Sequence, residues 1–225
     1  MQQKSSMRWV ILFILVFGTA MLNFSNLIFA SRPTDVMEQF NMTQTQLTAI
    51  STVGQLPGAF FSVWLGHMID KKGVRMLPGI LLALAAACQI WRCFAADYVS
   101  LFIITFLAGA FFLPTQILQG KLLGVWFSRE EMGTAMGIYG AGAGLGTTLA
   151  FAFGGLFPTI GIAFMVIAAG YVIEAALWFL FIKMPAGLAG GPVSEAPKGN
   201  LKNVFKSKNM WLLMICGGLS VGAAL

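Results

Sequence analysis

The sequence predicts an all-α membrane protein built around a six-transmembrane-helix bundle. Hydrophobic residues make up 58% of the 225 residues and charged residues only 10%, and the mean hydropathy is +0.81. A soluble domain of this size cannot bury so much apolar surface, so a lipid bilayer is the expected solvent. Backbone groups in lipid must satisfy their own hydrogen bonds, which leaves helices or closed barrels. The apolar segments are roughly 20 residues long and do not alternate, so helices are expected.

The first three spanning helices are expected at 9–30, 45–65 and 74–94. The first run follows a basic segment and is longer than the about 7–15 apolar residues of a signal peptide, so we interpret it as a retained helix. The polar segment 32–44 is expected to be an external loop. Thr43 and Gln46 have the spacing of a capping box at the start of the second helix. The Gln-Leu-Pro-Gly sequence at 55–58 predicts a kink near mid-membrane.

The fourth and sixth spanning helices are expected at 98–126 and 160–182. The fifth begins at 133 and ends at an outer turn, 154–161. Residues at alternating intervals of four and three lie on one face of the fourth helix, and this face is a candidate cavity lining. It carries Thr105, Gly109, Phe112, Gln116 and Gln119. The fifth helix holds three small-xxx-small pairs that permit close helix contact; these are Gly133/Gly137, Gly140/Gly144 and Gly142/Gly146.

The domain organisation follows from these runs. Residues 1–184 are expected to form the N-terminal bundle. Residues 185–208 are a polar cytoplasmic linker, in which apolar and lysine residues have the spacing of a short helix lying on the membrane surface. Residues 209–225 are expected to be the start of a seventh transmembrane helix, because this apolar run is shorter than the about 20 residues needed to cross a bilayer.

Five amides within the apolar runs are candidate contacts for a substrate. They are Asn23, Asn26, Gln55, Gln116 and Gln119. The first two are three residues apart and therefore share a helix face. Buried amides without partners cost free energy, so we expect them to face other helices or a water-filled cavity. Hydrogen bonding between helices and contact with a substrate both account for them.

Glu174 is the candidate coupling residue. It lies about ten residues before Met184, which at about 1.5 Å per residue places it roughly 15 Å from the inner surface, near the bilayer centre. An ionised carboxylate facing lipid there is costly, so we expect Glu174 to be neutral, paired or turned toward the bundle interior. It is either a proton carrier or a hydrogen-bonded structural residue.

The segment 66–77 lies between the second and third apolar runs and is expected to be a tight loop. Gly66 is expected to allow close approach of a neighbouring helix, and Gly73 to supply a turn. The segment resembles the G-x-L-x-D-[RK]-x-G-[RK]-[RK] signature of the major facilitator superfamily of transporters. The matching residues are Gly66, Asp70, Lys71, Gly73 and Arg75, whereas Met68 and Val74 depart from the pattern. The resemblance implies that the matching residues act as a conformational latch on the cytoplasmic side.

The resemblance also implies twelve helices in two six-helix halves, with a small-molecule substrate bound between the halves near the bilayer midplane. A C-terminal half of the same protein, absent from this sequence, would complete the cavity. Transport would follow alternating access, as a symporter or uniporter. The pattern Trp126-Phe127-Ser128-Arg129…Gly133 is similar to branches that handle small organic or inorganic anions. A drug or metabolite efflux transporter of the same superfamily is the alternative.

Charge placement predicts the orientation. All 14 Lys and Arg residues except Arg32 and Arg92 fall on one side if the N-terminus is cytoplasmic, as expected in a plasma (inner) membrane. These two arginines are candidate anion contacts on the outer side, and Arg92 is expected to snorkel to the interface. The net charge of +6 therefore reflects membrane orientation, and no nucleic-acid partner is expected.

Other function classes find little support in the sequence. It contains no paired carboxylates, metal-ligand spacing or activated nucleophile, so we expect no enzyme, no metal and no cofactor. A channel or structural membrane subunit is the alternative of another class, although no charged ring or filter motif is present. The expected partners are the lipid bilayer, a small-molecule substrate and a coupling proton.

Overall fold

A computed structural model of the chain describes residues 6–182. This part contains eight helices, namely α1 (Met7–Ser31), α2 (Pro33–Phe40), α3 (Gln44–Val53), α4 (Leu56–Lys72), α5 (Met76–Arg92), α6 (Tyr98–Trp126), α7 (Met132–Gly154) and α8 (Ile160–Phe181). Four of them, α1, α6, α7 and α8, are long and apolar enough to cross a membrane. α5 is a shorter apolar helix. The linker and seventh helix expected at 185–208 and 209–225 lie outside the described residues.

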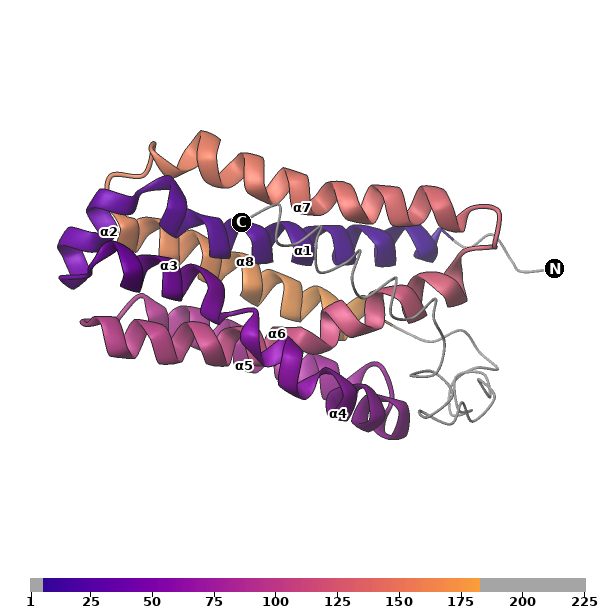
Figure 1. Cartoon of the computed structure of the whole chain (residues 1–225). Helices are drawn as coiled ribbons and strands as arrows, with labels where there is room; N and C mark the ends of the chain where they lie inside the picture. Colours follow the sequence, from indigo (N-terminus) through magenta and orange to yellow (C-terminus); the bar gives the residue numbers. More distant parts are fainter. Residues whose placement is uncertain (1–5, 183–225) are drawn as a thin grey trace, which may run out of the picture. The chain divides into compact units, whose positions relative to one another are not determined.

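The long helices run side by side and reverse direction at each connection (Figure 1). The start of α1, the turn after α4, the turn between α6 and α7 and the end of α8 lie at one end of the bundle. α1 packs against α7 and α8, while α5 packs against α6 and α8. α1 and α8 therefore hold the two sides of the bundle together.

The expectation of a plain loop at 32–44 is wrong, because this segment contains the helix α2. Pro33 stands at its beginning, where a fixed φ suits the first helical turn and no backbone N–H is required. Val36 and Phe40 are buried on its inner face. Asn41 ends it with a left-handed φ of 48°, a conformation that Asn tolerates better than most residues. A short amphipathic helix thus covers the end of the bundle.

The second expected helix is broken into α3 and α4, at the position where the sequence predicts a kink. Gly54 and Gln55 separate the two helices, and a proline lies in the first turn of α4. The capping box at the start of α3 is confirmed: the backbone N–H of Thr43 donates to the Gln46 side chain (2.8 Å), and the backbone N–H of Gln46 donates to the Thr43 hydroxyl (3.3 Å).

The loop expected at 66–77 is wrong in its extent. α4 continues to Lys72, and the chain turns only at 73–75 before α5 begins. The turn residue is correctly predicted, because Gly73 has a φ of 89° that other residues resist. Close helix approach at Gly66 is also wrong: a Cβ added there would be 4.0 Å from the Ile117 side chain, an ordinary van der Waals contact.

Close approach occurs instead between α1 and α7. A Cβ added at Gly142 would lie 2.8 Å from the carbonyl oxygen of Val16, and one added at Gly146 would lie 2.2 Å from that of Ala20. The other two expected pairs, Gly133/Gly137 and Gly140/Gly144, meet no described atom within 4 Å. Only one of the three glycine pairs therefore serves helix packing within residues 6–182.

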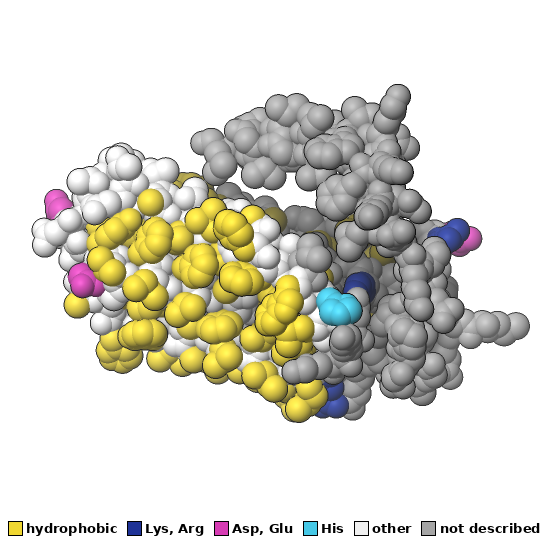
Figure 2. All heavy atoms as spheres, turned by 60° about the horizontal axis from the view of Figure 1, so that its bottom comes forward, with side chains coloured by type: hydrophobic (Ala, Val, Ile, Leu, Met, Phe, Trp, Pro, Cys, Tyr) yellow, Lys and Arg dark blue, Asp and Glu magenta, His cyan; other side chains and the backbone are white. Residues whose placement is uncertain are grey.

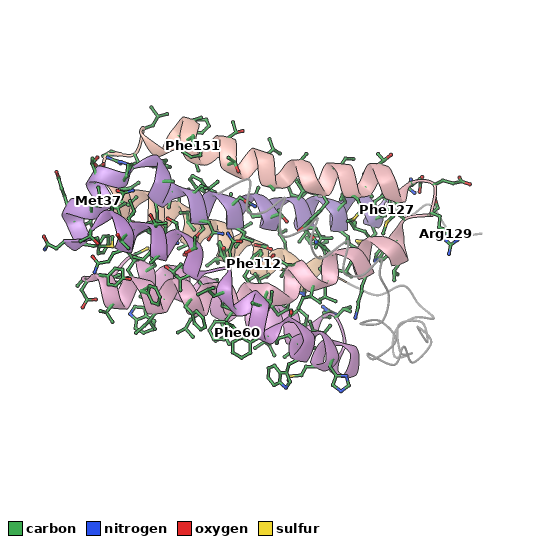
Figure 3. All side chains as sticks on the ribbon, viewed as in Figure 1. Met37, Phe60, Phe112, Phe127, Arg129 and Phe151 are labelled. Carbon is green, nitrogen blue, oxygen red and sulfur yellow. The ribbon has the colours of Figure 1, made fainter. Side chains whose placement is uncertain are left out.

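The bundle exposes large apolar side chains on its outer surface. Phe60 on α4 and Phe151 on α7 are 74% and 56% exposed and point away from the bundle, whereas Phe112 on α6 lies inside it (Figure 3). Figure 2 shows a wide hydrophobic face. Further exposed side chains of α4 and α5 are Phe61, Trp64, Ile80, Leu84 and Trp91. An apolar exterior of this extent is suited to lipid contact.

Candidate functional site

A polar cavity of about 240 Å³ lies between α1, the α3–α4 break, α6 and α7. It is lined by Thr19, Leu22, Asn23, Asn26, Gly54, Gln55, Gly58, Gly109, Leu113, Gln116 and Tyr139. Four of the five predicted amides therefore come together from three separate regions of the chain. Gln119 does not line this cavity; it lies further along α6, and its side-chain oxygen is buried without a hydrogen-bond partner in the described structure. Substrate contact by these amides stays a prediction.

The helix break positions one wall of the cavity. α6 approaches the break so closely that a Cβ added at Gly109 would lie 1.9 Å from the carbonyl oxygen of Gly54. Only glycine fits such a backbone contact. Irregular backbone at membrane depth is tolerated where it lines a cavity or is buried in protein. Gly54, Gln55 and Gly109 therefore form one wall of the polar cavity at this contact.

The cavity offers neutral hydrogen-bonding groups. Asn23 donates its side-chain N–H to the carbonyl oxygen of Thr19 (2.9 Å), which leaves its oxygen as an acceptor. Tyr139 and Thr19 each contribute a hydroxyl to the lining. No charged residue lines the cavity from residues 6–182. The site as described can bind hydroxyl, carboxyl or amide groups through neutral amides and hydroxyls.

Glu174 on α8 is enclosed next to this cavity. Its exposed fraction is 1%, so the expectation that it avoids lipid is confirmed. Gly18 on α1 makes room for it, because a Cβ added there would lie 1.9 Å from Glu174 Oε1. Glu174 Oε2 has no hydrogen-bond partner in the described structure. A second, small cavity reaches this carboxyl, with Thr19, Gln116 and Tyr139 in the walls of both cavities.

Arg92 lies inside the bundle, and the expectation that it snorkels to the interface is wrong. It is 2% exposed, and its Nη1 donates to Ser25 Oγ (2.7 Å) and Gln89 Oε1 (3.0 Å). The guanidinium carbon is 4.3 Å and 4.4 Å from the ring centroids of Phe29 and Phe164. These hydrogen bonds and cation–π contacts stabilise the cation away from water. Sequence reasoning missed Ser25 and Gln89, although Gln89 shares a helix face with Arg92.

Arg32, the other outer-side candidate, is also held by protein groups. It donates to the carbonyl oxygen of Phe157 and forms an ion pair with Asp35. The contacts join the end of α1 to the α7–α8 turn and to α2. Anion contact by Arg32 or Arg92 stays a prediction, but neither side chain lines the polar cavity.

The segment that contains the predicted latch residues lies at the opposite end of the bundle. Arg75 Nη2 donates to the carbonyl oxygen of Phe179 (2.7 Å), and Trp178 Nε1 donates to the carbonyl oxygen of Arg75 (3.3 Å). These bonds tie the turn after α4 to the last turns of α8. Asp70 and Lys71 lie in the last turn of α4, beside this contact in the sequence. At the same end, Arg8 on α1 pairs with Glu131 before α7 (2.7 Å).

A helical bundle with an apolar exterior, a broken helix and a polar cavity between its helices defines a multi-pass membrane protein with a solute-sized cavity. The chain belongs to the Major Facilitator Superfamily, whose family model matches residues 10–225. The resemblance of the segment 66–77 to this family is thereby confirmed. The family is one of transporters and not of enzymes.

Three relatives show what the chain is similar to. It is 20% identical to a probable L-galactonate transporter of Escherichia coli over 90% of this chain and 49% of that protein. It is 25% identical to a hexuronate transporter of Bacillus subtilis over 66% of this chain and 36% of that protein. It is 26% identical to a probable nitrate/nitrite antiporter of Thermus thermophilus over 52% of this chain and 26% of that protein. The chain spans about half the length of the curated relatives it matches, or less.

Proposed function

We propose that the whole protein is a secondary transporter that moves a small organic or inorganic anion by alternating access. The observation that carries this proposal is the neutral polar cavity at the α3–α4 break, in a chain that belongs to a family of transporters. The relatives' names support the anion: galactonate, hexuronate, nitrate and nitrite are all anions. Side-chain N–H and hydroxyl groups can donate to the oxygens of such a solute.

The described helices fit six membrane crossings in this proposal. α3 and α4 together form one broken crossing and α5 forms another, in addition to the four long helices. The N-terminus is cytoplasmic, because cations gather at the end of the bundle where α1 begins and α4 ends. A second half would close the cavity from its other side and would supply further contacts to the solute.

A conformational role for the latch residues and a coupling role for Glu174 complete the proposal. Asp70, Lys71, Gly73 and Arg75 act as a latch that stabilises one conformation on the cytoplasmic side, as the bonds from Arg75 to α8 suggest. Glu174 exchanges the coupling proton. Its burial beside the polar cavity supports this role, because a buried carboxyl whose small cavity shares three wall residues with the polar cavity can respond to occupancy of the polar cavity.

A neutral polar metabolite, or a drug exported by the protein, is the second candidate substrate. It is favoured by one observation: no charged side chain lines the cavity from the described helices. An anion bound in this cavity would be stabilised by hydrogen bonds alone or by cationic side chains of the second half.

Counterflow in liposomes that contain the full-length protein tests the substrate class. We expect exchange of L-galactonate, a hexuronate or nitrate, and none of the corresponding neutral alcohols. Gln116→Leu should raise KM, because it removes an amide from the cavity wall. Gln44→Leu, at the exposed start of α3, is the matched control and should leave KM unchanged. Exchange of neutral solutes alone would replace the anion by the second candidate.

The coupling role is tested with Glu174→Gln, which keeps the side-chain shape and removes its titration. We expect the variant to keep exchange and to lose concentrative, pH-dependent uptake. If the variant accumulates solute at the wild-type level, Glu174 is not the proton carrier.

A further inference from the structure

A carboxyl oxygen of Glu174 is buried without a partner at the edge of a cavity. Glu174 Oε2 has no hydrogen bond within the described structure, and the side chain is 1% exposed. Buried polar atoms almost always have a partner, either protein or water. The carboxyl borders a small cavity of about 10 Å³.

The small cavity has the size and lining of a water site. A buried water needs at least about 10–15 Å³ of this kind of volume and two to four polar partners. Five of the seven lining residues carry polar groups, and the complete lining is Leu15, Thr19, Phe112, Thr115, Gln116, Tyr139 and Glu174. The volume of about 10 Å³ is at the lower limit for one water and leaves no room for a second.

The hydroxyl groups around the cavity can receive hydrogen bonds from such a water. Thr115 Oγ1 donates to the carbonyl oxygen of Phe112 (2.7 Å), so its hydrogen is committed and its lone pairs are available as acceptors. Thr19 and Tyr139 also carry hydroxyls, and both residues border both cavities. Together with Gln116 they form the wall between the Glu174 carboxyl and the polar cavity.

We propose that the small cavity is a one-water site that carries the proton between Glu174 and the polar cavity. This inference rests on the proposed coupling role of Glu174. The carboxyl O–H gives its proton to the water, and the water passes a proton along the hydroxyls of Thr19 and Tyr139 to a solvent water in the polar cavity. The reverse sequence reloads the carboxyl. Each passage moves one proton, leaves the water unchanged and changes the charge of Glu174 by one unit.

The charged and titratable neighbours of Glu174 agree with a transient carboxylate. Tyr139 faces it from α7 and Tyr171 from α8. Residues of α1 and α6 in the small cavity are not titratable. Arg92 on α5 and Glu174 each act electrostatically on Tyr171, but Arg92 forms no ion pair with Glu174 within residues 6–182. Within residues 6–182 no cation pairs with Glu174. A buried carboxylate without a cation is costly, so its proton must return before the transporter completes a cycle.

A substitution at Thr115 tests the water site without altering the lining of the polar cavity, because Thr115 lines only the small cavity. Thr115→Val in the full-length protein removes an acceptor for the water and keeps the side-chain volume. We expect concentrative, pH-driven uptake to slow by about tenfold or more, since relayed proton transfer depends on a positioned hydrogen-bond partner, while exchange stays within about twofold. Thr115→Ser keeps the hydroxyl and should restore coupling; if Thr115→Val does not fold, Thr115→Ala replaces it.

Thr148→Val is the matched control, because Thr148 makes the same kind of bond to its own helix (to Gly144 O, 2.9 Å) and does not line either cavity. The Thr148→Val variant should take up solute at the same rate as the wild type. Infrared spectroscopy supplies a second readout: the carboxylic C=O band that is absent in Glu174→Gln should shift to higher frequency in Thr115→Val.

Three outcomes overturn the inference. If Thr115→Val accumulates solute like Thr148→Val while Glu174→Gln does not, the water site is wrong and the coupling role of Glu174 stands. If Glu174→Gln accumulates solute at the wild-type level, both proposals fail. If Na⁺ stimulates uptake and removes the C=O band, the oxygen-lined cavity holds a metal cation and not a water.

Discussion

Gly146→Ala should destabilise the bundle by separating α1 from α7. The added Cβ would lie 2.2 Å from the carbonyl oxygen of Ala20 and 2.9 Å from its Cα. Because these are backbone atoms, no side-chain rotation relieves the contact, and the helices must move apart by about 1 Å to reach ordinary contact distances. Helix association in lipid depends on close van der Waals packing. We therefore expect a cost near the upper end of the about 1–3 kcal/mol that overpacking causes.

Thermal unfolding of the purified full-length protein in detergent measures this cost. A loss of about 3 kcal/mol corresponds to a fall in Tm of at most roughly 6–12 °C, because the shift is roughly 2–4 °C per kcal/mol for 150–250 residues and becomes smaller in a longer protein. Gly144→Ala is the matched control, because it makes the same change on the same helix and meets no described atom within 4 Å. Equal Tm values for the two variants would refute the packing argument.

Three further predictions concern charged groups. Arg92→Lys should lower Tm, because a lysine cannot keep the forked hydrogen bonds and the stacking between two aromatic rings; an unchanged Tm would contradict the buried cluster. The Ser100 side chain and backbone hold the pKa of Asp97 below its ordinary value. This stabilisation of the α6 start is present above the unfolded-state pKa and is lost as the pH falls through the folded-state pKa. Hydrogen exchange of the first α6 amides should therefore accelerate only at acidic pH. In Asp97→Asn, their exchange should show no such step with pH. Asp70→Asn should slow transport and leave equilibrium substrate affinity within a few-fold; abolished binding in a folded variant would contradict the latch.

Much of the helix arrangement is predictable because lipid restricts the backbone to a few structures. The expected run at 98–126 coincides with α6, and 160–182 differs from α8 by one residue at its end. The capping box at Thr43 and the turn at Gly73 are predictable for a similar reason. Each depends on a local geometric requirement that only a few residue types meet.

The site is predictable only in part, because its residues meet through tertiary packing. Amides within apolar runs indicate a polar interior, and four of them line one cavity. The spacing of α6 also places Gln119 on that face, yet it lies outside the cavity lining. Glycine pairs on α7 look alike in the sequence, but only Gly142 and Gly146 face α1. Periodicity defines which residues share a face, whereas the neighbour of that face depends on the whole bundle.

Arg92 and Glu174 illustrate why single charges in apolar helices are ambiguous in a sequence. Each avoids lipid, and a snorkelling cation, a buried cluster and a coupling site all satisfy that requirement. The structure distinguishes the two residues by their surroundings. Arg92 uses its Nη atoms in hydrogen bonds to Ser25 and Gln89 and lies between two aromatic rings, which is the environment of a cation with a structural role. Glu174 keeps an oxygen without a protein partner and borders a polar cavity. Arg92 Nε also lacks a partner within the described residues, but Arg92 lines neither the polar cavity nor the small one. Glu174 Oε2 borders a water-sized space, and this position is what the proposed proton exchange requires.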